Sequence, residues 1–315
     1  MEYAIELDGI SKSWPGILAL KDISFQVKKS TIHGFLGPNG AGKSTTMNII
    51  SGLIPPTSGQ VKILGQNVRD LTNQTQKYIG FLPEHPPLYL NMTVQDYLVF
   101  VTKINLNNSN NVDKIIEQCS LQKVEKRLIG NLSKGYRQRV AIAAALVTDP
   151  EIVILDEPTV GLDPISIIEI RELILSLKEK HTILLSTHIL HEVSLLCSDI
   201  TIINNRSILS SGPIADIKNS FNVGRVLKTE VKHWSEERRA YFLKQFNLES
   251  LAINKKANST ELTFYFNGLE DVRSALSSDL IAKNCGLLSF SEEAVDVESY
   301  FRKITEKDNN KRIQS

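Results

Sequence analysis

The stretch that decides the fold reads Gly37-Pro38-Asn39-Gly40-Ala41-Gly42-Lys43-Ser44. It matches every position of G-x-x-x-x-G-K-[ST], the phosphate-binding P-loop pattern. An apolar segment typical of a strand, residues 31–36, comes before it, and residues 45–50 are typical of the first turns of a helix. Because a P-loop lies between a strand and a helix, this context favours the motif over an accidental glycine-rich turn.

The residue types in this loop suit a triphosphate. Its glycines permit backbone conformations that a Cβ excludes, so successive N–H groups can point at one anion, and the following helix adds the positive end of its dipole. Lys43 can reach the β- and γ-phosphates, and the Ser44 hydroxyl can hold Mg²⁺. The predicted nucleotide contacts are Gly37, Pro38, Asn39, Gly40, Ala41, Gly42, Lys43, Ser44 and Thr45.

The bulk properties narrow the class of protein. The 315 residues suffice for one large domain with a small one, or for two medium domains. A formal net charge of +1 gives no indication of nucleic-acid binding. Three widely spaced cysteines argue against a disulfide framework or a metal site and favour a reducing cytosol. We expect no signal peptide, and no apolar run approaches the ~20 residues that span a bilayer, so a membrane role requires another subunit.

The first half of the chain divides into a β-rich and a helical region. Alternating apolar residues, and a strand after the Pro-Pro-Thr-Ser-Gly turn, predict antiparallel β-structure over residues 1–70. Residues 86–148 are predicted to form a helical subdomain. Its first helix is capped by Asn91 or Thr93, and residues 105–111 form a polar surface loop.

From residue 152 onward, strand and helix patterns alternate. Strands are expected over 152–155, 182–186 and 200–203, and helices over 164–180 and 189–197. This βαβαβ order predicts a mostly parallel sheet with helices on both faces. The predicted fold class is therefore an α/β P-loop NTPase core with a mixed sheet.

A different unit is expected after a boundary near 213–222. We assign residues 1–220 to the nucleotide-binding domain, 221–304 to a small α+β domain and 305–315 to a flexible tail. The predicted order β-α-β-β-α-β-α is close to a ferredoxin-like pattern. Its strands are expected over 226–231, 251–253, 262–266 and 287–290, and its helices over 236–246, 269–281 and 297–304.

Two carboxylates end the apolar strand 152–155. Asp156 and Glu157 stand where a Walker B strand delivers its acids, so Asp156 is expected to hold Mg²⁺ and Glu157 to orient or deprotonate the attacking water. The alternative is an ordinary strand whose end is solvated by acids. The P-loop upstream favours the functional interpretation.

At this point the chain resembles the ATP-binding subunits of ABC transporters. Residues 132–138, Leu-Ser-Lys-Gly-Tyr-Arg-Gln, are similar to the family signature Leu-Ser-Gly-Gly-Gln just before Walker B. Gly161-Leu162-Asp163 follows as the D-loop, and Ser186-Thr187-His188 ends the next strand as the switch histidine. Trp14 precedes the first hairpin, where an aromatic usually stacks on adenine. The resemblance covers about residues 2–215.

The resemblance implies further site residues. Ser133 and Gly135 would bind the γ-phosphate of an ATP held by the opposite subunit, so that a homodimer encloses two ATP molecules with Mg²⁺. His188 would contact the γ-phosphate beside Glu157. Glu84 stands where the family usually has a glutamine that touches Mg²⁺ and couples to the membrane subunit. Lys134 and Tyr136 depart from the signature; we expect Lys134 to face solvent.

These features together predict an ATPase subunit at the cytoplasmic face of the membrane. A dimer is expected to hydrolyse ATP to ADP and phosphate and to drive a separate permease, in the manner of bacterial exporter subunits. No nucleic-acid partner is expected. The alternatives are a soluble ABC ATPase that acts on ribosomes or DNA, a nucleotide-binding regulator with little turnover, and a P-loop kinase outside the ABC class. The cargo cannot be deduced from this chain.

Overall fold

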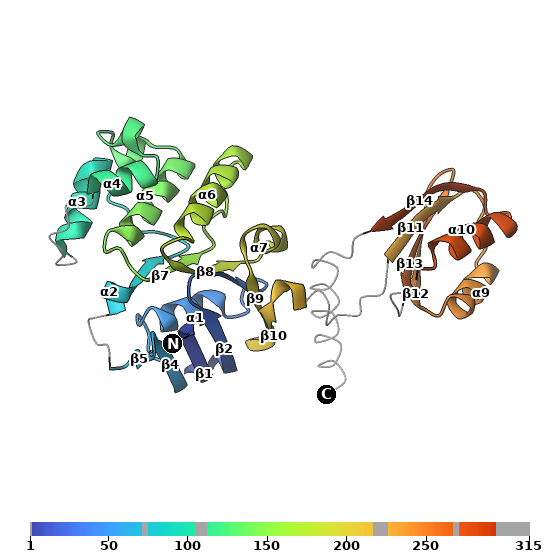
Figure 1. Ribbon diagram of the computed structural model, residues 1–315, viewed down its shortest axis with the longest axis horizontal. Helices are drawn as coiled ribbons and strands as arrows, with labels where there is room; N and C mark the ends of the chain where they lie inside the picture. The colour runs from blue at the N-terminus through green and yellow to red at the C-terminus, as the bar shows by residue number, and fades with distance from the viewer. Residues whose placement is uncertain (1, 71–74, 105–111, 217–225, 267–270, 294–315) are drawn as a thin grey trace. The chain divides into compact units, whose positions relative to one another are not determined.

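The computed structural model describes residues 2–70, 75–104, 112–216, 226–266 and 271–293 (Figure 1). The chain divides into two compact units, Met1–Ile214 and Ala215–Ser315, and each is described by itself. The division at residue 220 stays a prediction, because residues 217–225 lie outside the described ranges.

A six-stranded sheet forms the centre of the first unit. Its order is β10-β9-β3-β8-β7-β6, in which β9, β3, β8, β7 and β6 run parallel and β10 pairs antiparallel with β9. The bounds are β3 Ile32–Leu36, β6 Ile79–Leu82, β7 Ile152–Asp156, β8 Thr182–Thr187, β9 Asp199–Asn204 and β10 Ser207–Pro213. The parallel α/β core predicted from the sequence is confirmed. The prediction did not include β6 and β10, which are a four-residue strand and the return strand of a hairpin.

A second sheet, order β2-β1-β4-β5, is antiparallel, as predicted for the N-terminal residues. Its strands are β1 Tyr3–Trp14, β2 Ile17–Lys28, β4 Ser58–Ile63 and β5 Gln66–Asn67. Helix α1, Lys43–Ile50, shares one core with both sheets, in which Phe25, Phe35, Met47 and Ile154 are buried together. A Cβ on Gly34 would project from the opposite face of β3, where it would lie 2.8 Å from Val193 of α7. Helices therefore cover both faces of the parallel sheet (Figure 1).

The remaining helices of this unit are α2 Thr75–Tyr78, α3 Val94–Ile104, α4 Val112–Gln118, α5 Lys134–Leu146, α6 Pro164–Leu177 and α7 Leu190–Leu196. Thr93, and not Asn91, caps α3. Its hydroxyl accepts from the Asp96 N–H at 3.1 Å and donates to the Asp96 carboxylate at 2.6 Å. The helical subdomain is therefore present, while the predicted loop 105–111 lies outside the described residues.

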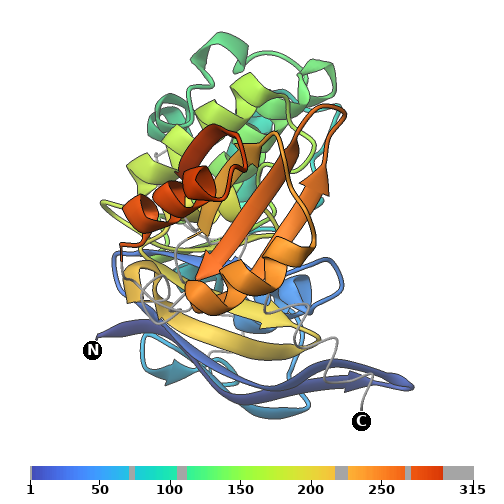
Figure 2. The same ribbon diagram turned by 90° about the vertical axis from the view of Figure 1, so that its right-hand side faces the viewer.

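The second unit has the element order β11, α9, β12, β13, α10, β14 and the antiparallel sheet order β12-β13-β11-β14. Its bounds are β11 Val226–Val231, α9 Glu237–Gln245, β12 Leu248–Lys255, β13 Thr260–Phe266, α10 Arg273–Ala282 and β14 Leu287–Glu293. Both helices cover one face of the sheet (Figure 2), and Phe242, Leu276 and Phe264 share a separate core. This confirms a small α+β unit with the predicted ferredoxin-like order. The predicted helix 297–304 and the tail 305–315 lie outside the described residues.

Candidate functional site

The P-loop connects the end of β3 to the start of α1, and its glycines are required by their surroundings. Gly40 and Gly42 have φ angles of 77° and 112°. A Cβ on Gly37 would lie 2.5 Å from the carbonyl oxygen of Ile203, and one on Gly42 would lie 2.5 Å from Leu20. Gly42 also caps α1 without any side-chain hydrogen bond. The loop thus forms a close-fitting cradle at an uncapped helix N-terminus, which suits an anion.

Lys43 folds back over this cradle. Its ammonium donates to the carbonyl oxygens of Gly37 at 2.9 Å and Pro38 at 3.3 Å, and it lies 3.1 Å from the Glu157 carboxylate. Both side chains of the ion pair are almost fully buried, 6% and 5% exposed. A buried ion pair with these extra hydrogen bonds is satisfied, but removal of one partner would leave an uncompensated charge.

Glu157 lies just beyond β7 in a left-handed conformation, with φ 50°. Its N–H donates to the Ser186 carbonyl at 3.0 Å, which fixes it against the end of β8. Its carboxylate is 2.9 Å from Nδ1 of His188, whose side chain is 40% exposed. Asp156 is buried and accepts a hydrogen bond from the Ser186 hydroxyl. The parallel pairing of β7 and β8 therefore brings Glu157 and His188 together, since both follow strand ends at one edge of the sheet.

These groups border one open cleft of about 560 Å³. The predicted residues that line it are Trp14, Asn39, Gly40, Gly42, Lys43, Ser44, Thr45, Glu84, Glu157 and His188. A cradle of glycines, a lysine, a hydroxyl and a carboxylate paired with a histidine has the donor set of a nucleoside triphosphate site with its metal.

The chain is similar to known proteins. Residues 20–160 match the ABC transporter family. The uncharacterised ABC transporter ATP-binding protein YcbN of Bacillus subtilis is 30% identical over 96% of this chain and 97% of its own length. The bacitracin transport ATP-binding protein BcrA of Bacillus licheniformis is 40% identical over 69% of this chain and 72% of its own length. The chain belongs to the ABC transporter ATP-binding proteins.

Solved structures agree with this assignment. An ATP-binding subunit of an ABC transporter superposes with a TM-score of 0.63 at 30% identity, covering 69% of this chain and 93% of the other. The dimeric structure of the ABC transporter cassette MJ0796 superposes with a TM-score of 0.62 at 26% identity, covering 67% of this chain and 98% of the other. Both coverages correspond to a single ATP-binding unit within the longer chain.

The two predicted phosphate contacts of the signature, Ser133 and Gly135, do not line the cleft of their own chain. Ser133 caps α5, where its hydroxyl accepts from the Tyr136 N–H at 3.3 Å. A Cβ on Gly135 would lie 2.4 Å from the Ser166 hydroxyl, so the start of α5 packs tightly against the start of α6. Neither Ser133 nor Gly135 lines the cleft, and neither do Gly37, Pro38, Ala41 and Asp156.

Lys134 is exposed to solvent, as expected, and it also contacts its own chain. Its side chain is exposed, but its ammonium donates to the carbonyl oxygen of Val160 at 3.0 Å. Val160 lines the nucleotide cleft, and its own N–H donates to the Glu157 carbonyl at 3.3 Å. The lysine therefore connects the signature to the residue just before the D-loop within one chain, a contact that spacing along the sequence does not predict.

Two predicted residues lie at the rim of the cleft. Trp14 is 42% exposed at the end of β1, with the Lys12 ammonium 5.1 Å from its ring centroid. Glu84 is exposed in the loop after β6. Sequence reasoning missed further residues that line the cleft, namely Ile17, Leu18, Ala19, Val160 and Arg206. They come from a hairpin, the residue before the D-loop and the turn before β10, and no sequence motif marks them.

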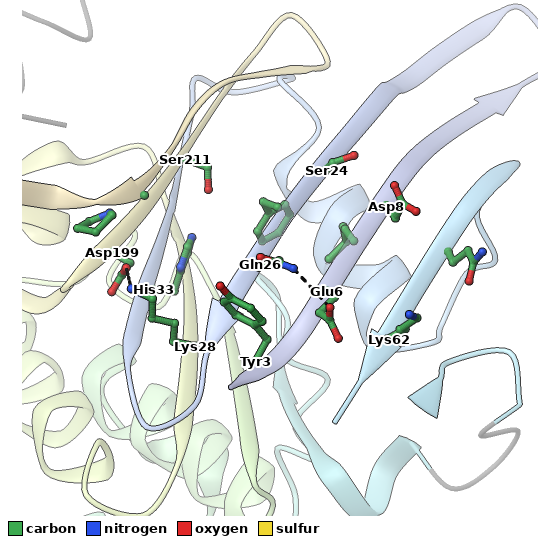
Figure 3. Close-up of a pocket in the computed structure, with 15 residues that line it drawn as sticks. Tyr3, Glu6, Asp8, Ser24, Gln26, Lys28, His33, Lys62, Asp199 and Ser211 are labelled. Atoms are coloured by element: carbon green, nitrogen blue, oxygen red, sulfur yellow. Dashed lines mark hydrogen bonds and ion pairs between the residues drawn. The ribbon is translucent and has the colours of Figure 1, made fainter. Parts of the chain in front are cut away.

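A second, larger cleft of about 730 Å³ lies between the two sheets (Figure 3). Its lining includes Lys28 and Asp199, which form a 3.3 Å ion pair, and the buried His33. Burial lowers the pKa of His33 to about 4, with Asp199 opposing this shift and Lys28 adding to it. No predicted site residue lines this cleft.

Proposed function

We propose that this chain is an ATPase subunit that dimerises around two Mg-ATP and drives a separate membrane permease in export. The observation that carries the proposal is the convergence of the P-loop lysine with Glu157 and His188 in one cleft. The family assignment supports the ATPase, and the names of the relatives support transport.

Each group of residues in the cleft has its own expected role in binding or hydrolysing ATP. The loop amides of residues 37–45 and Lys43 would hold the phosphates, and Trp14 would stack on the adenine. Ser44, Asp156 and Glu84 would hold Mg²⁺, which when bound neutralises charge on the phosphates. Glu157 would orient or deprotonate the water, and His188 would contact the γ-phosphate.

The ion pair between Lys43 and Glu157 suggests how nucleotide prepares the site. In the structure the lysine satisfies the carboxylate and two loop carbonyls. A triphosphate is a stronger partner for the ammonium than one carboxylate, so nucleotide would draw Lys43 away. Glu157 would then keep His188 and become free to accept a proton from water.

The position of the signature supports the dimer. Ser133 and Gly135 begin α5 but do not line the cleft of their own chain. The N-terminus of α5 carries the partial positive charge of a helix dipole, as the helix after the P-loop does. A second copy of the chain can therefore supply the missing side of each site. A similar cassette, MJ0796, has been solved as a dimer.

A groove of about 550 Å³ beside the helical subdomain suits the permease. Its lining includes the apolar residues Leu53, Phe81, Pro87 and Val101, next to the loop that carries Glu84. Among the described residues, no helix is long and apolar enough to cross a bilayer. We infer that a short helix from the membrane subunit occupies this groove and holds the ATPase at the cytoplasmic face. The relatives include the bacitracin transport protein BcrA and the lantibiotic transport protein SrtF of Streptococcus pyogenes, which supports export.

The decisive experiment compares Glu157→Gln with Lys43→Ala. The glutamine variant is expected to bind Mg-ATP, to lose about 10²–10⁴-fold in kcat, and to collect as an ATP-stabilised dimer on a sizing column. The alanine variant is expected to lose ATP affinity by calorimetry. Wild-type turnover in Glu157→Gln would remove this carboxylate from the reaction. If the full-length Glu157→Gln protein does not dimerise with ATP, even with its permease, the proposed dimer around two Mg-ATP is wrong.

A further inference from the structure

The proposed mechanism leaves one fully buried carboxylate unexplained. Glu192, in α7, is 0% exposed and does not line the nucleotide cleft. Its Oε1 accepts a hydrogen bond from the Thr159 hydroxyl at 2.5 Å, and its Oε2 accepts one from the Thr187 hydroxyl at 2.9 Å. Arg171 of α6 lies 3.5 Å from Oε1. A charge is buried at this depth only when it is paired and hydrogen-bonded, so these contacts account for its stability.

The two threonines belong to the segments that carry the proposed catalytic pair. Thr159 follows Glu157 by two residues, and Thr187 immediately precedes His188. The carbonyl of Thr187 also accepts from the N–H of Gly37, the first P-loop residue, at 3.3 Å. One carboxylate therefore ties the loop after β7 to the end of β8, and through Thr187 to the P-loop.

The direction of these hydrogen bonds is fixed by chemistry. Because an ionised carboxylate has no hydrogen to give, both threonine hydroxyls donate to it. The Thr187 oxygen in turn accepts from the Ile189 N–H at 3.0 Å, so this hydroxyl donates one hydrogen bond and accepts another. A glutamine in place of Glu192 offers one acceptor oxygen and an NH₂ group. One of the two threonines would then face a donor instead of an acceptor.

We propose that Glu192 is a positioning residue for ATP hydrolysis. It holds Thr159 and Thr187 at a fixed separation, so that Glu157 and His188 stay in contact when Lys43 changes partner. The inference rests on the proposed ATPase function. It follows from the general requirement that reacting groups be held to within a fraction of an ångström by the residues behind them.

The test measures kcat, KM and ATP affinity for full-length variants with their permease. Glu192→Gln and Thr187→Val are expected to lower kcat by about 10–100-fold, because small displacements of reacting groups have effects of this size. ATP affinity should change by less than about 3-fold, since neither residue lines the cleft. Thr187→Ser keeps the hydroxyl and should recover most of the loss. Thr201→Val is the matched control, because it removes a buried hydroxyl from β9, away from the cleft.

A double variant separates positioning from general weakening of the fold. Once Glu157→Gln has removed the carboxylate that Glu192 positions, adding Glu192→Gln should cause little further loss of kcat. If the losses in kcat caused by Glu157→Gln and Glu192→Gln multiply in the double variant, the inference is wrong. It is also wrong if Thr187→Val is as active as Thr201→Val. If Glu192→Gln fails to fold, the comparison of Thr187→Val with Thr187→Ser decides. An inactive wild type would refute the ATPase itself, whereas an active wild type with an inactive Glu157→Gln and unaffected Thr187→Val refutes only the role of Glu192.

Discussion

His33 shows how a single buried residue makes stability depend on pH. It is 2% exposed, its Nε2 shares a 2.8 Å hydrogen bond with the Thr201 hydroxyl, and its Nδ1 has no partner among the described residues. Burial lowers its pKa from 6.5 to about 4, ahead of an opposing effect of Asp199 and a reinforcing effect of Lys28. The folded protein therefore holds a neutral imidazole near neutral pH.

This pKa predicts acid sensitivity. Because the folded pKa lies below the unfolded value, the unfolded chain takes up the proton first as the pH falls. The free energy of unfolding should then decline between pH 6.5 and about pH 4, by about 3 kcal/mol from this group alone. Denaturant titrations across this window should show a shallower decline for His33→Gln, whereas the exposed control His191→Gln keeps the wild-type slope. Identical slopes for wild type and His33→Gln would refute the prediction.

At the scale of elements, the D-loop and the start of α5 are joined through Lys134 and Gly161. Gly161 has a φ of 68°, and a Cβ there would lie 2.3 Å from the Lys134 ammonium. Because the end of a lysine side chain is flexible, it would move aside and lose its hydrogen bond to Val160. The same glycine thus serves the backbone turn and the contact between the two elements.

A double-mutant cycle tests this contact. Gly161→Ala should cost about 1 kcal/mol for its left-handed backbone, and so should Gly16→Ala, whose φ is 77° with open space around it. Only the first should couple to Lys134→Ala, by about 0.5–1 kcal/mol in the free energy of unfolding. If the changes in the free energy of unfolding are additive for Lys134→Ala combined with Gly161→Ala, as they are expected to be with Gly16→Ala, the lysine contact contributes nothing to stability.

At the scale of the whole molecule, each unit has its own core. The first buries residues such as Phe35 and Met47 between its sheets, and the second buries Phe242 and Leu276 beneath its sheet. A unit with its own core can in principle fold alone. A chain ending at residue 214 is therefore expected to fold and to bind Mg-ATP within about 3-fold of the full-length affinity, as measured by calorimetry. An insoluble or non-binding product would show that the second unit completes the first.

The sequence predicted the parts of this protein that depend on local pattern. Alternating strands, the two candidate caps of α3 and the α-β order of the second unit follow from spacing within a few residues. The four-residue β6 was missed because a short strand with a glycine carries too little periodicity. Gly80 is required there because a Cβ would lie 2.0 Å from the carbonyl oxygen of Ala145, a neighbour known only from the packing.

By itself the sequence determined the P-loop, the alternation of strands and helices from residue 152 onward, and the two acids at the end of β7 and just beyond it, because each depends on adjacent residues whose backbone preferences are local. The tertiary structure alone decided that Lys43 pairs with Glu157, that Lys134 reaches the D-loop and that Glu192 joins two threonines behind the site. Apart from the contact between Thr187 and Glu192, which are five positions apart, these contacts link residues 26 to 114 positions apart. They form only when strand register and helix packing bring distant side chains within hydrogen-bond distance, and no pattern along the chain encodes that distance directly.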